Sequence, residues 1–596
     1  MNNSFKPSQR LFSIVFLASI LLLILVYGFA RGRTSERNIP NLEKGERVGA
    51  LRGDIISADG YTLVTSSKTY RAEIDIRSID LNKLDYFLKL FQIYAFLDDK
   101  EMKKIKTRLL SAIKKNQPYN FVLSYDIDSK AASYLQELSK KTYYSGFFKP
   151  FKNARGKAET RGLDIIEHSR KRVFSKGDIL TPVLGYSERS LDGNIFENIA
   201  KKGIEKYYDI CLAPQSDYKV EGFKDVGGNI IMNSKSFISN QIDGCKLYLN
   251  INLKLQKGLE NIATDAMKKL GAKQVIIGVL DSKNANILAL ATSKRYDPYN
   301  RKKDLSYLNT DAVEFEYEPG SVIKPIAFAN LLKLGRITPF EWVNTHGGRM
   351  KLDKFYIQDS HPKDKLIAED IIVYSSNIGM VEISNKESAK ELIQGFQDFN
   401  IGAKTGIDLP YEKTGYIKSY NKTYEVEKNT MAYGYGFRTT FIQLLAAFNV
   451  FNNRGNWIPP KLAKYYSYQD DKKEIYTENI KEVLPLEIAK QMNRILIKTA
   501  NQKSLADYWP NGITVGGKTG TARISAKGGY AREYNANFFG FANDENNKYT
   551  IGVLVMSPDK DKQGYYASQT AVPVASQVVK QLVEDNFLKP SYKSVD

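Results

Sequence analysis

Metal-ligating side chains are scarce in this sequence. Cys211 and Cys245 are its only cysteines, and His168, His346 and His361 are its only histidines. None of the five has the spacing of a zinc site, so we expect neither a bound metal nor any other cofactor. The two cysteines are compatible with a disulfide in an oxidising compartment or with two buried thiols, and the sequence does not decide between these.

Features of nucleic-acid-binding proteins are also lacking. Lys and Arg outnumber Asp and Glu by 87 to 66, but the chain has no compact basic run and no RNA- or DNA-binding motif. We therefore expect no nucleic-acid partner, and attribute the net charge of +21 to a solvated surface near anionic lipid. With 42% hydrophobic and 12% aromatic residues, the 596-residue chain is expected to fold into two to four domains.

One long run, Leu11–Ala30, carries no charge and is rich in Leu, Ile and Val. As a helix it would span about 30 Å, the thickness of a bilayer's hydrocarbon core, which predicts a transmembrane anchor. A cleaved signal peptide is the alternative, because Gly28-Phe29-Ala30 resembles a small-residue cleavage site. The apolar stretch of a signal peptide is usually only about 7–15 residues, which favours the anchor. Basic residues flank the run on both sides, so charge does not set its orientation.

The remaining periodicity predicts an α+β chain. Two short strands, within 49–56 and 58–64, flank an Asp-Gly turn, and a charged helical region follows over about 84–115. In that region Ile105, Leu109 and Ile113 lie on one stripe, which predicts a core face. Further strands are expected near 274–281, 285–291, 536–542 and 549–556, with a long, mostly helical stretch between the two pairs. Strands from both ends of this region suggest one domain closed by its own termini.

Ser321 and Lys324 are the strongest candidates for chemistry. Pro319-Gly320 forms a turn, and Ser321 then begins a helix whose apolar positions include Val322 and Ile326. Because the two side chains are three residues apart, they share one helix face. A lysine in a water-poor site has a lowered pKa and can take a proton from a neighbouring hydroxyl.

Ser-x-x-Lys alone is a weak signal. The same spacing recurs at Ser111/Lys114, Ser216/Lys219, Ser360/Lys363, Ser419/Lys422 and Ser557/Lys560. Order and context single out Ser321. It is followed by Ser375-Ser376-Asn377, a polar loop that closes a helix, and by Lys518-Thr519-Gly520, which follows a strand-like run. Two other Lys-Thr-Gly triplets, at Lys404 and Lys413, precede a proline or lie in a loop, where no sheet edge is expected.

This ordered set resembles the signature of the penicillin-binding proteins and serine β-lactamases. Flanking residues resemble the class B, cell-division transpeptidases in particular, at 317–321, 375–379, 433–436, 517–522, 52–60 and 203–208. Elongation-type class B enzymes typically have Pro, Asp and Ser where this chain has Glu318, Asn377 and Thr519. The resemblance therefore favours the division type.

The resemblance implies a membrane helix, an elongated mixed α/β pedestal and a C-terminal transpeptidase domain with an antiparallel, β-lactamase-like sheet flanked by helices. We expect a cytoplasmic tail over residues 1–10, the anchor over 11–30, a linker over 31–47, the pedestal over 48–240, the transpeptidase domain over 241–584 and a tail over 585–596. The protein would be a single-pass protein of the inner membrane with its bulk in the periplasm.

It also implies a mechanism. Ser321 would attack the penultimate D-alanine carbonyl of a stem pentapeptide with Lys324 as base, and β-lactams would acylate the same serine. Ser375 would relay a proton to the leaving amine, and Asn377 would hold the substrate amide. The catalytic Lys518, with Thr519, Gly520 and Thr521, would bind the substrate's carboxylate end. The backbone N–H groups of Ser321 and Thr521 would form the oxyanion hole.

Septal peptidoglycan crosslinking is the predicted function, with a membrane glycan polymerase and other division proteins as partners. Three alternatives remain at this stage: an elongation-type transpeptidase, a membrane β-lactam sensor or β-lactamase, and an inactive division scaffold. The long pedestal disfavours the sensor and the β-lactamase, and the three intact motifs disfavour the scaffold.

Overall fold

The computed structural model describes residues 7–34, 43–117, 119–153, 156–192, 195–223, 230–232, 236–301, 305–469, 471–526 and 529–591. The chain divides into two compact units. One comprises residues 1–50 with 215–242, and the other comprises residues 51–214 with 243–596.

The first unit contains the membrane-spanning candidate and a small sheet. Helix α1, Pro7–Thr34, includes a 21-residue segment, Leu11–Arg31, with a mean hydropathy of 2.7 and exposed side chains. Among the described residues it is the one helix long and apolar enough to cross a membrane, in agreement with the predicted anchor. Strands β1 (Glu43–Val48), β10 (Tyr218–Phe223) and β11 (Phe237–Ser239) pair antiparallel in that order. The stretch expected as a linker thus includes most of β1, whose partner strand lies far along the sequence.

The amino-terminal part of the second unit is built on a nine-stranded sheet. Its order is β23-β22-β12-β2-β3-β7-β9-β8, with β4 also paired to β3. The predicted hairpin is present, because β2 (Ile55–Ile56) pairs antiparallel with β3 (Thr62–Asp75) across a turn in which Gly60 has a φ of +83°. The other strands are β4 (Asn120–Asp128), β7 (Leu163–Phe174), β8 (Ser187–Asp192), β9 (Ile195–Ala200), β12 (Lys246–Leu249), β22 (Ala463–Tyr468) and β23 (Asp471–Glu474).

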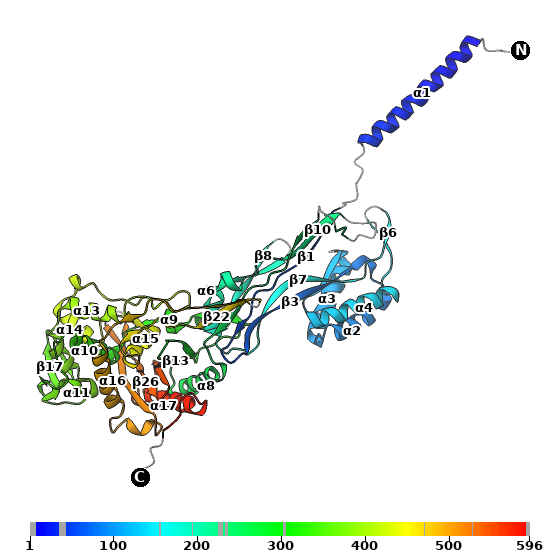
Figure 1. The fold of residues 1–596 in the computed structure, drawn as a ribbon. Helices are drawn as coiled ribbons and strands as arrows, with labels where there is room; N and C mark the ends of the chain where they lie inside the picture. The colour runs from blue at the N-terminus through cyan, green and yellow to red at the C-terminus, as the bar shows by residue number, and fades with distance from the viewer. Residues whose placement is uncertain are drawn as a thin grey trace. The chain divides into compact units, whose positions relative to one another are not determined.

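Three helices pack on this sheet: α2 (Leu84–Tyr94), α3 (Asp99–Lys115) and α4 (Ser129–Tyr144) (Figure 1). The region expected to be helical contains two helices, α2 and α3, separated where Asp98 caps the start of α3. Ile105 and Leu109 of α3 are buried, and Ile113 packs against the same core, which confirms the predicted stripe.

Residues 203–214, which contain the short helices α6 (Gly203–Tyr207) and α7 (Asp209–Leu212), are joined to the sheet region by polar and covalent contacts. Buried Glu205 forms ion pairs with Arg52 and Arg172, with N–O distances of 2.6 Å each. Cys211 and Cys245 form a disulfide with a Cα–Cα distance of 5.3 Å. Because Cys245 immediately precedes β12, the disulfide links residues 203–214 to the start of that strand.

The carboxyl-terminal part of this unit contains a five-stranded antiparallel sheet in the order β14-β13-β27-β26-β25. The strands are β13 (Gln274–Asp281), β14 (Ile287–Thr292), β25 (Thr514–Ala526), β26 (Gly529–Asn543) and β27 (Lys548–Met556). The pairs predicted from opposite ends of the domain therefore share one sheet. Only β25 and β14 are edge strands, so the predicted Lys518-Thr519-Gly520 lies on an edge.

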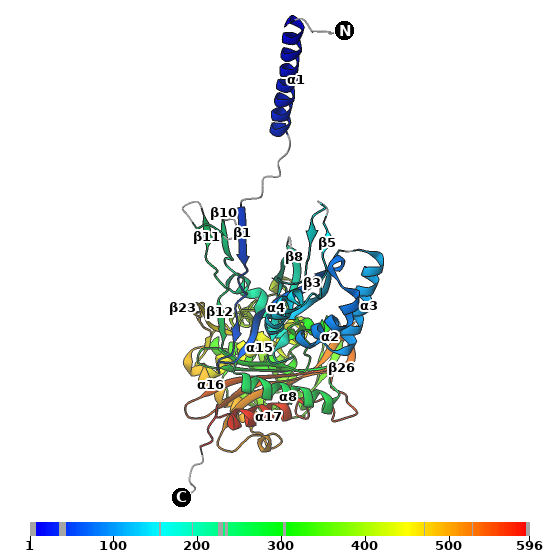
Figure 2. The ribbon, with the colours of Figure 1, turned by 90° about the vertical axis from the view of Figure 1, so that its right-hand side faces the viewer.

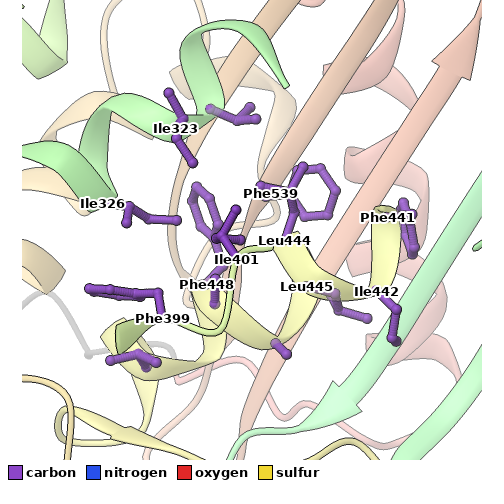
Figure 3. Packing of buried hydrophobic residues seen from close by; sticks show 14 of the residues in the cluster. Ile323, Ile326, Phe399, Ile401, Phe441, Ile442, Leu444, Leu445, Phe448 and Phe539 are labelled. Atoms are coloured by element: carbon purple, nitrogen blue, oxygen red, sulfur yellow. The ribbon is translucent and has the colours of Figure 1, made fainter. Parts of the chain in front are cut away.

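Helices cover both faces of this sheet. Helices α8 (Leu253–Leu270) and α17 (Ala571–Glu584) lie side by side against one face, as Figure 2 shows. Helix α15 (Phe441–Asn452) packs on the other face, where Phe448 and Phe441 contact Phe539 of β26 at ring distances of 5.7 and 5.3 Å (Figure 3). Ile323 and Ile326 lie beside the same cluster, so the core directly supports the segment that carries Ser321.

The helices between β14 and β25 form the predicted helical stretch. They are α9 (Asp311–Glu314), α10 (Lys324–Lys333), α11 (Ala368–Val373), α12 (Asn377–Ser384), α13 (Ala389–Asp398), α14 (Glu425–Ala432), α15 and α16 (Leu486–Ala500).

Candidate active site

Ser321 lies in a tight turn that leads into α10. Residues Gly320–Ile323 form a 3₁₀ turn, and the α-helix begins at Lys324, slightly later than the sequence predicts. In a 3₁₀ turn side chains three residues apart are nearly eclipsed, so Ser321 and Lys324 project in the same direction. Gly320 has a φ of +61°, and its N–H donates to Gly434 O at 3.0 Å. A Cβ on Gly434 would lie 2.0 Å from Gly320 O, so this approach requires glycine.

Lys324 is fully buried, and its amine is surrounded by oxygen atoms. Nζ donates to Ser375 O and to Asn377 Oδ1, both at 2.7 Å, and lies 3.4 Å from Ser375 Oγ. Burial lowers the pKa of Lys324 well below its ordinary value of 10.5, and the neighbouring Lys518 lowers it further. The hydroxyl of half-buried Ser321 forms no hydrogen bond with any residue that the structure describes, although the backbone N–H of Lys324 donates to Ser321 O.

The second motif connects α11 to α12, as the sequence predicts. Ser375 has a φ of +58°, which turns its hydroxyl towards the two lysines. Ser376, rather than Ser375, caps a helix, because its Oγ accepts from Gly379 N at 2.8 Å at the start of α12. Ser375 is therefore free of a capping role.

Buried Asp359 holds this loop in place. Its Oδ1 accepts from the backbone N–H groups of Asn377 at 2.6 Å and Ile378 at 3.2 Å, and its Oδ2 accepts from Ser376 Oγ. Sequence reasoning did not select Asp359, since its partners are backbone groups 18 and 19 residues away and no spacing pattern marks them. It does not contact a reacting group, so it is a positioning residue.

The third motif lies on edge strand β25. Lys518 is buried, and its Nζ donates to Ser375 Oγ and to Thr519 O, both at 2.9 Å. Burial lowers the pKa of Lys518 from 10.5 to about 7. The other two Lys-Thr-Gly lysines, Lys404 and Lys413, are exposed and lie outside strands.

The neighbouring residues of β25 fit closely against the nucleophile turn. A Cβ on Gly520 would lie 2.9 Å from Val322 Cγ1 and 3.2 Å from Pro319 O, so a larger residue would push the strand away. Half-buried Thr519 and Thr521 alternate with Lys518 and Gly520 along the strand. The Thr521 hydroxyl accepts from Ala567 N at 3.0 Å.

The structure thus brings together Ser321, Lys324, Ser375, Asn377 and Lys518 from three segments of the sequence. Two amines meet at one hydroxyl: Lys518 donates to Ser375 Oγ, and that hydroxyl lies beside Lys324 Nζ. A neutral amine has two N–H donors and one lone pair. Ser375 O and Asn377 Oδ1 occupy both donors of Lys324, which leaves its lone pair available to accept a proton.

Comparison with known proteins agrees with this arrangement. Residues 275–580 match the family model of the penicillin-binding protein transpeptidase domain, and residues 47–249 match that of the penicillin-binding protein dimerisation domain. The first match covers more than half of the chain.

Individual relatives extend over most of its length. The chain is 28% identical over 431 residues to peptidoglycan D,D-transpeptidase FtsI of Buchnera aphidicola subsp. Schizaphis graminum, covering 72% of each protein. It is 24% identical over 550 residues to the FtsI of Buchnera aphidicola subsp. Baizongia pistaciae, covering 90% of this chain and 88% of the relative. The fold is similar to that of penicillin-binding protein 2X from Streptococcus thermophilus, with a TM-score of 0.72 at 18% identity, covering 91% of this chain and 80% of that one.

The predicted family and enzyme class are confirmed. The chain belongs to the penicillin-binding proteins, as a class B member in which a dimerisation domain precedes a serine-type transpeptidase domain.

Proposed function

We propose that this protein is the peptidoglycan D,D-transpeptidase that crosslinks stem peptides during septal cell-wall synthesis, with Ser321 as the acylated residue. The observation that carries the proposal is the contact chain from Lys518 through Ser375 to Lys324 beside an unengaged serine. These contacts supply a buried base (Lys324), a hydroxyl that can pass protons (Ser375) and a cation (Lys518) within one site.

In the first half-reaction, Ser321 Oγ forms a bond to the penultimate D-alanine carbonyl carbon while Lys324 takes the hydroxyl proton. The tetrahedral oxyanion lies between the backbone N–H groups of Ser321 and Thr521. The C–N bond to the terminal D-alanine then breaks, and the leaving amine takes a proton from Lys324 through Ser375. Asn377 holds the substrate amide while this occurs.

Lys518 accounts for recognition of the substrate's terminal carboxylate, together with Thr519, Gly520 and Thr521. A carboxylate beside the lysine favours its protonated form, so substrate binding raises the pKa of Lys518. In the second half-reaction an amine of a neighbouring stem attacks the Ser321 ester and its proton passes to Lys324. The ester C–O bond then breaks, and Lys324 returns the proton to Ser321 Oγ, which regenerates the serine. A β-lactam follows the first half-reaction and remains attached to Ser321.

The septal role rests on Glu318, Asn377 and Thr519, which resemble the division type, and on the FtsI names of two relatives. We further propose that α1 anchors the chain in the inner membrane with residues 35–596 in the periplasm, where stem peptides are found. A membrane glycan polymerase and other division proteins are the expected partners. The proposed domains keep the predicted limits of 48–240 for the pedestal and 241–584 for the transpeptidase.

Labelling with a fluorescent penicillin tests the nucleophile. Wild type should form a stable adduct, Ser321→Ala should form none, and Ser419→Ala, a matched serine with the same Lys spacing, should label like wild type. Turnover of the adduct within seconds would instead indicate a β-lactamase.

Incubation with stem pentapeptide and an acceptor amine should release D-alanine and yield a crosslinked product by mass spectrometry. Depletion in cells should produce filaments, whereas round cells would indicate an elongation role.

A further inference from the structure

A β-hairpin lies next to the Ser375–Asn377 loop, which we call the catalytic loop, and has one face that the proposed mechanism does not use. Strands β17 (Arg349–Leu352) and β18 (Phe355–Gln358) pair antiparallel. Leu352 and Ile357 are buried against the main core, with Met350 packed beside them. Since side chains alternate across a strand, the intervening residues project outward.

The outward face consists of Arg349, Lys351, Tyr356 and Gln358, and we call it the hairpin face. In the register of the pair Arg349 lies opposite Gln358, and Lys351 lies opposite Tyr356. All four residues are exposed, and the Arg349 guanidinium lies 4.6 Å from the centroid of the Tyr356 ring. The face therefore holds two cations, an aromatic ring and an amide.

No acidic group neutralises these cations within the part of the chain that the structure describes. Neither Arg349 nor Lys351 forms an ion pair with a described carboxylate, whereas Lys386 and Lys365, on nearby elements, have Glu341 and the Trp342 ring as partners. An unpaired guanidinium held over a tyrosine ring keeps its planar fork available to a carboxylate.

The hairpin face is continuous with the catalytic loop. Gln358 ends β18, and its carbonyl oxygen accepts from Asn377 Nδ2 at 3.4 Å. The next residue, Asp359, holds the backbone of Asn377. A peptide chain whose amide is bound by Asn377 would therefore reach the hairpin face with its adjoining residues.

We propose that the hairpin face binds a carboxylate of the stem peptide distinct from the terminal carboxylate held near Lys518. This inference rests on the proposed function, since it identifies a second anchoring point for the same substrate. The groups near Lys518 hold the terminal carboxylate so that the end of the peptide lies beside Ser321. The hairpin face binds a carboxylate further along the peptide. Tyr356 packs against the intervening peptide and orients Arg349 for a bidentate contact.

The test uses full-length protein and two stem pentapeptides that differ only in an internal carboxylate, free in one and converted to a primary amide in the other. In Arg349→Gln/Lys351→Gln, kcat/KM for the free-carboxylate peptide should fall about fivefold for each cation, the upper value for an exposed ion pair, through KM rather than kcat. The amide peptide should react alike with both proteins. Lys464→Gln removes an exposed cation of β22 without a described ion pair, and should behave as wild type. Equal kcat/KM values for the free-carboxylate peptide in the wild type and the double variant would overturn the proposal.

Binding measurements separate this inference from the proposed function. Equilibrium binding of both peptides to Ser321→Ala, with and without the two Gln substitutions, needs no turnover. Tighter binding of the free-carboxylate peptide that is lost on substitution supports the hairpin face even if Ser321 proves not to be acylated. Absence of any preference between the peptides overturns it even if Ser321 labels with penicillin as expected.

Discussion

The two lysines predict an unusual pH dependence for acylation of Ser321. Lys324 must be neutral to accept a proton, and its pKa is lowered well below 10.5 by burial and by the charge of Lys518. Lys518 must be protonated to hold a carboxylate, and burial lowers its pKa to about 7. With rising pH, kcat/KM should therefore increase as Lys324 loses its proton and decrease as Lys518 loses its own. A pKa of about 7 implies a decrease of about 50-fold between pH 7 and pH 9 if the charge is essential.

The assay is stopped-flow acylation of full-length protein between pH 5 and pH 10 with a small depsipeptide substrate, free or methyl-esterified at its terminal carboxylate. The free substrate should show the alkaline decrease in kcat/KM near pH 7. Its kcat should fall only at higher pH, because the bound carboxylate raises the pKa of Lys518. The methyl ester should react more slowly and lack the decrease. A kcat/KM for the free substrate that stays constant to pH 9, or the same alkaline decrease in the ester, would refute the assignment to Lys518.

Three further perturbations test other parts of the fold. Asp359→Ala should lower the free energy of unfolding by about 3 kcal/mol and slow penicillin acylation, because it leaves the Asn377 N–H and its neighbours unpaired. Asp359→Asn keeps one acceptor and should lose less stability. An acylation rate of Asp359→Ala equal to that of the wild type would contradict this. Replacing Cys211 and Cys245 by serine should lower the free energy of unfolding, measured by urea denaturation, by about 4 kcal/mol, because the two residues are separated by 34 positions. An unchanged denaturation midpoint would argue against the disulfide. Burial raises the pKa of Glu387 to about 8, so the folded state binds its proton more tightly than the unfolded state, and this carboxyl should lower stability by a few kcal/mol as pH rises from 4.5 to 8. Glu387→Gln should reduce the slope of stability against pH by that amount, while buried Glu260 still contributes, and an identical slope in both proteins would exclude Glu387 as a source.

The structure brings the candidate residues of the three motifs together, whereas much of the architecture around them could not be predicted from the sequence. Chain order was sufficient to select Ser321, Ser375 and Lys518, because each motif also had a local signal: a Pro-Gly turn, a helix end and a strand. Strands β13 and β27 and the second half of β26 could likewise be predicted, since each is a nearly continuous apolar run.

Pairings between distant segments could not be predicted. Strand β1 pairs with β10 some 170 residues later, and β12 pairs with both β2 and β22, which come from opposite ends of the chain. Local periodicity carries no information about such partners. Asp359 escaped detection for a related reason, because a carboxylate that binds backbone N–H groups leaves no pattern in its partners' side chains.

Burial distinguishes Lys324 from the lysines of the other five Ser-x-x-Lys spacings. Lys324 is completely buried, whereas the other five lysines of the Ser-x-x-Lys pairs are exposed or half-buried: Lys114, Lys219, Lys363, Lys422 and Lys560. A solvated lysine keeps its proton at neutral pH and cannot act as a base. The pKa of Lys324 is lowered because β25, the α11–α12 loop and α10 bury its amine, and these elements come from residues nearly 200 apart. The spacing thus places a lysine beside a serine, but the lowered pKa that a base requires comes from the tertiary core. Burial likewise distinguishes Lys518, the one buried lysine among the three Lys-Thr-Gly triplets.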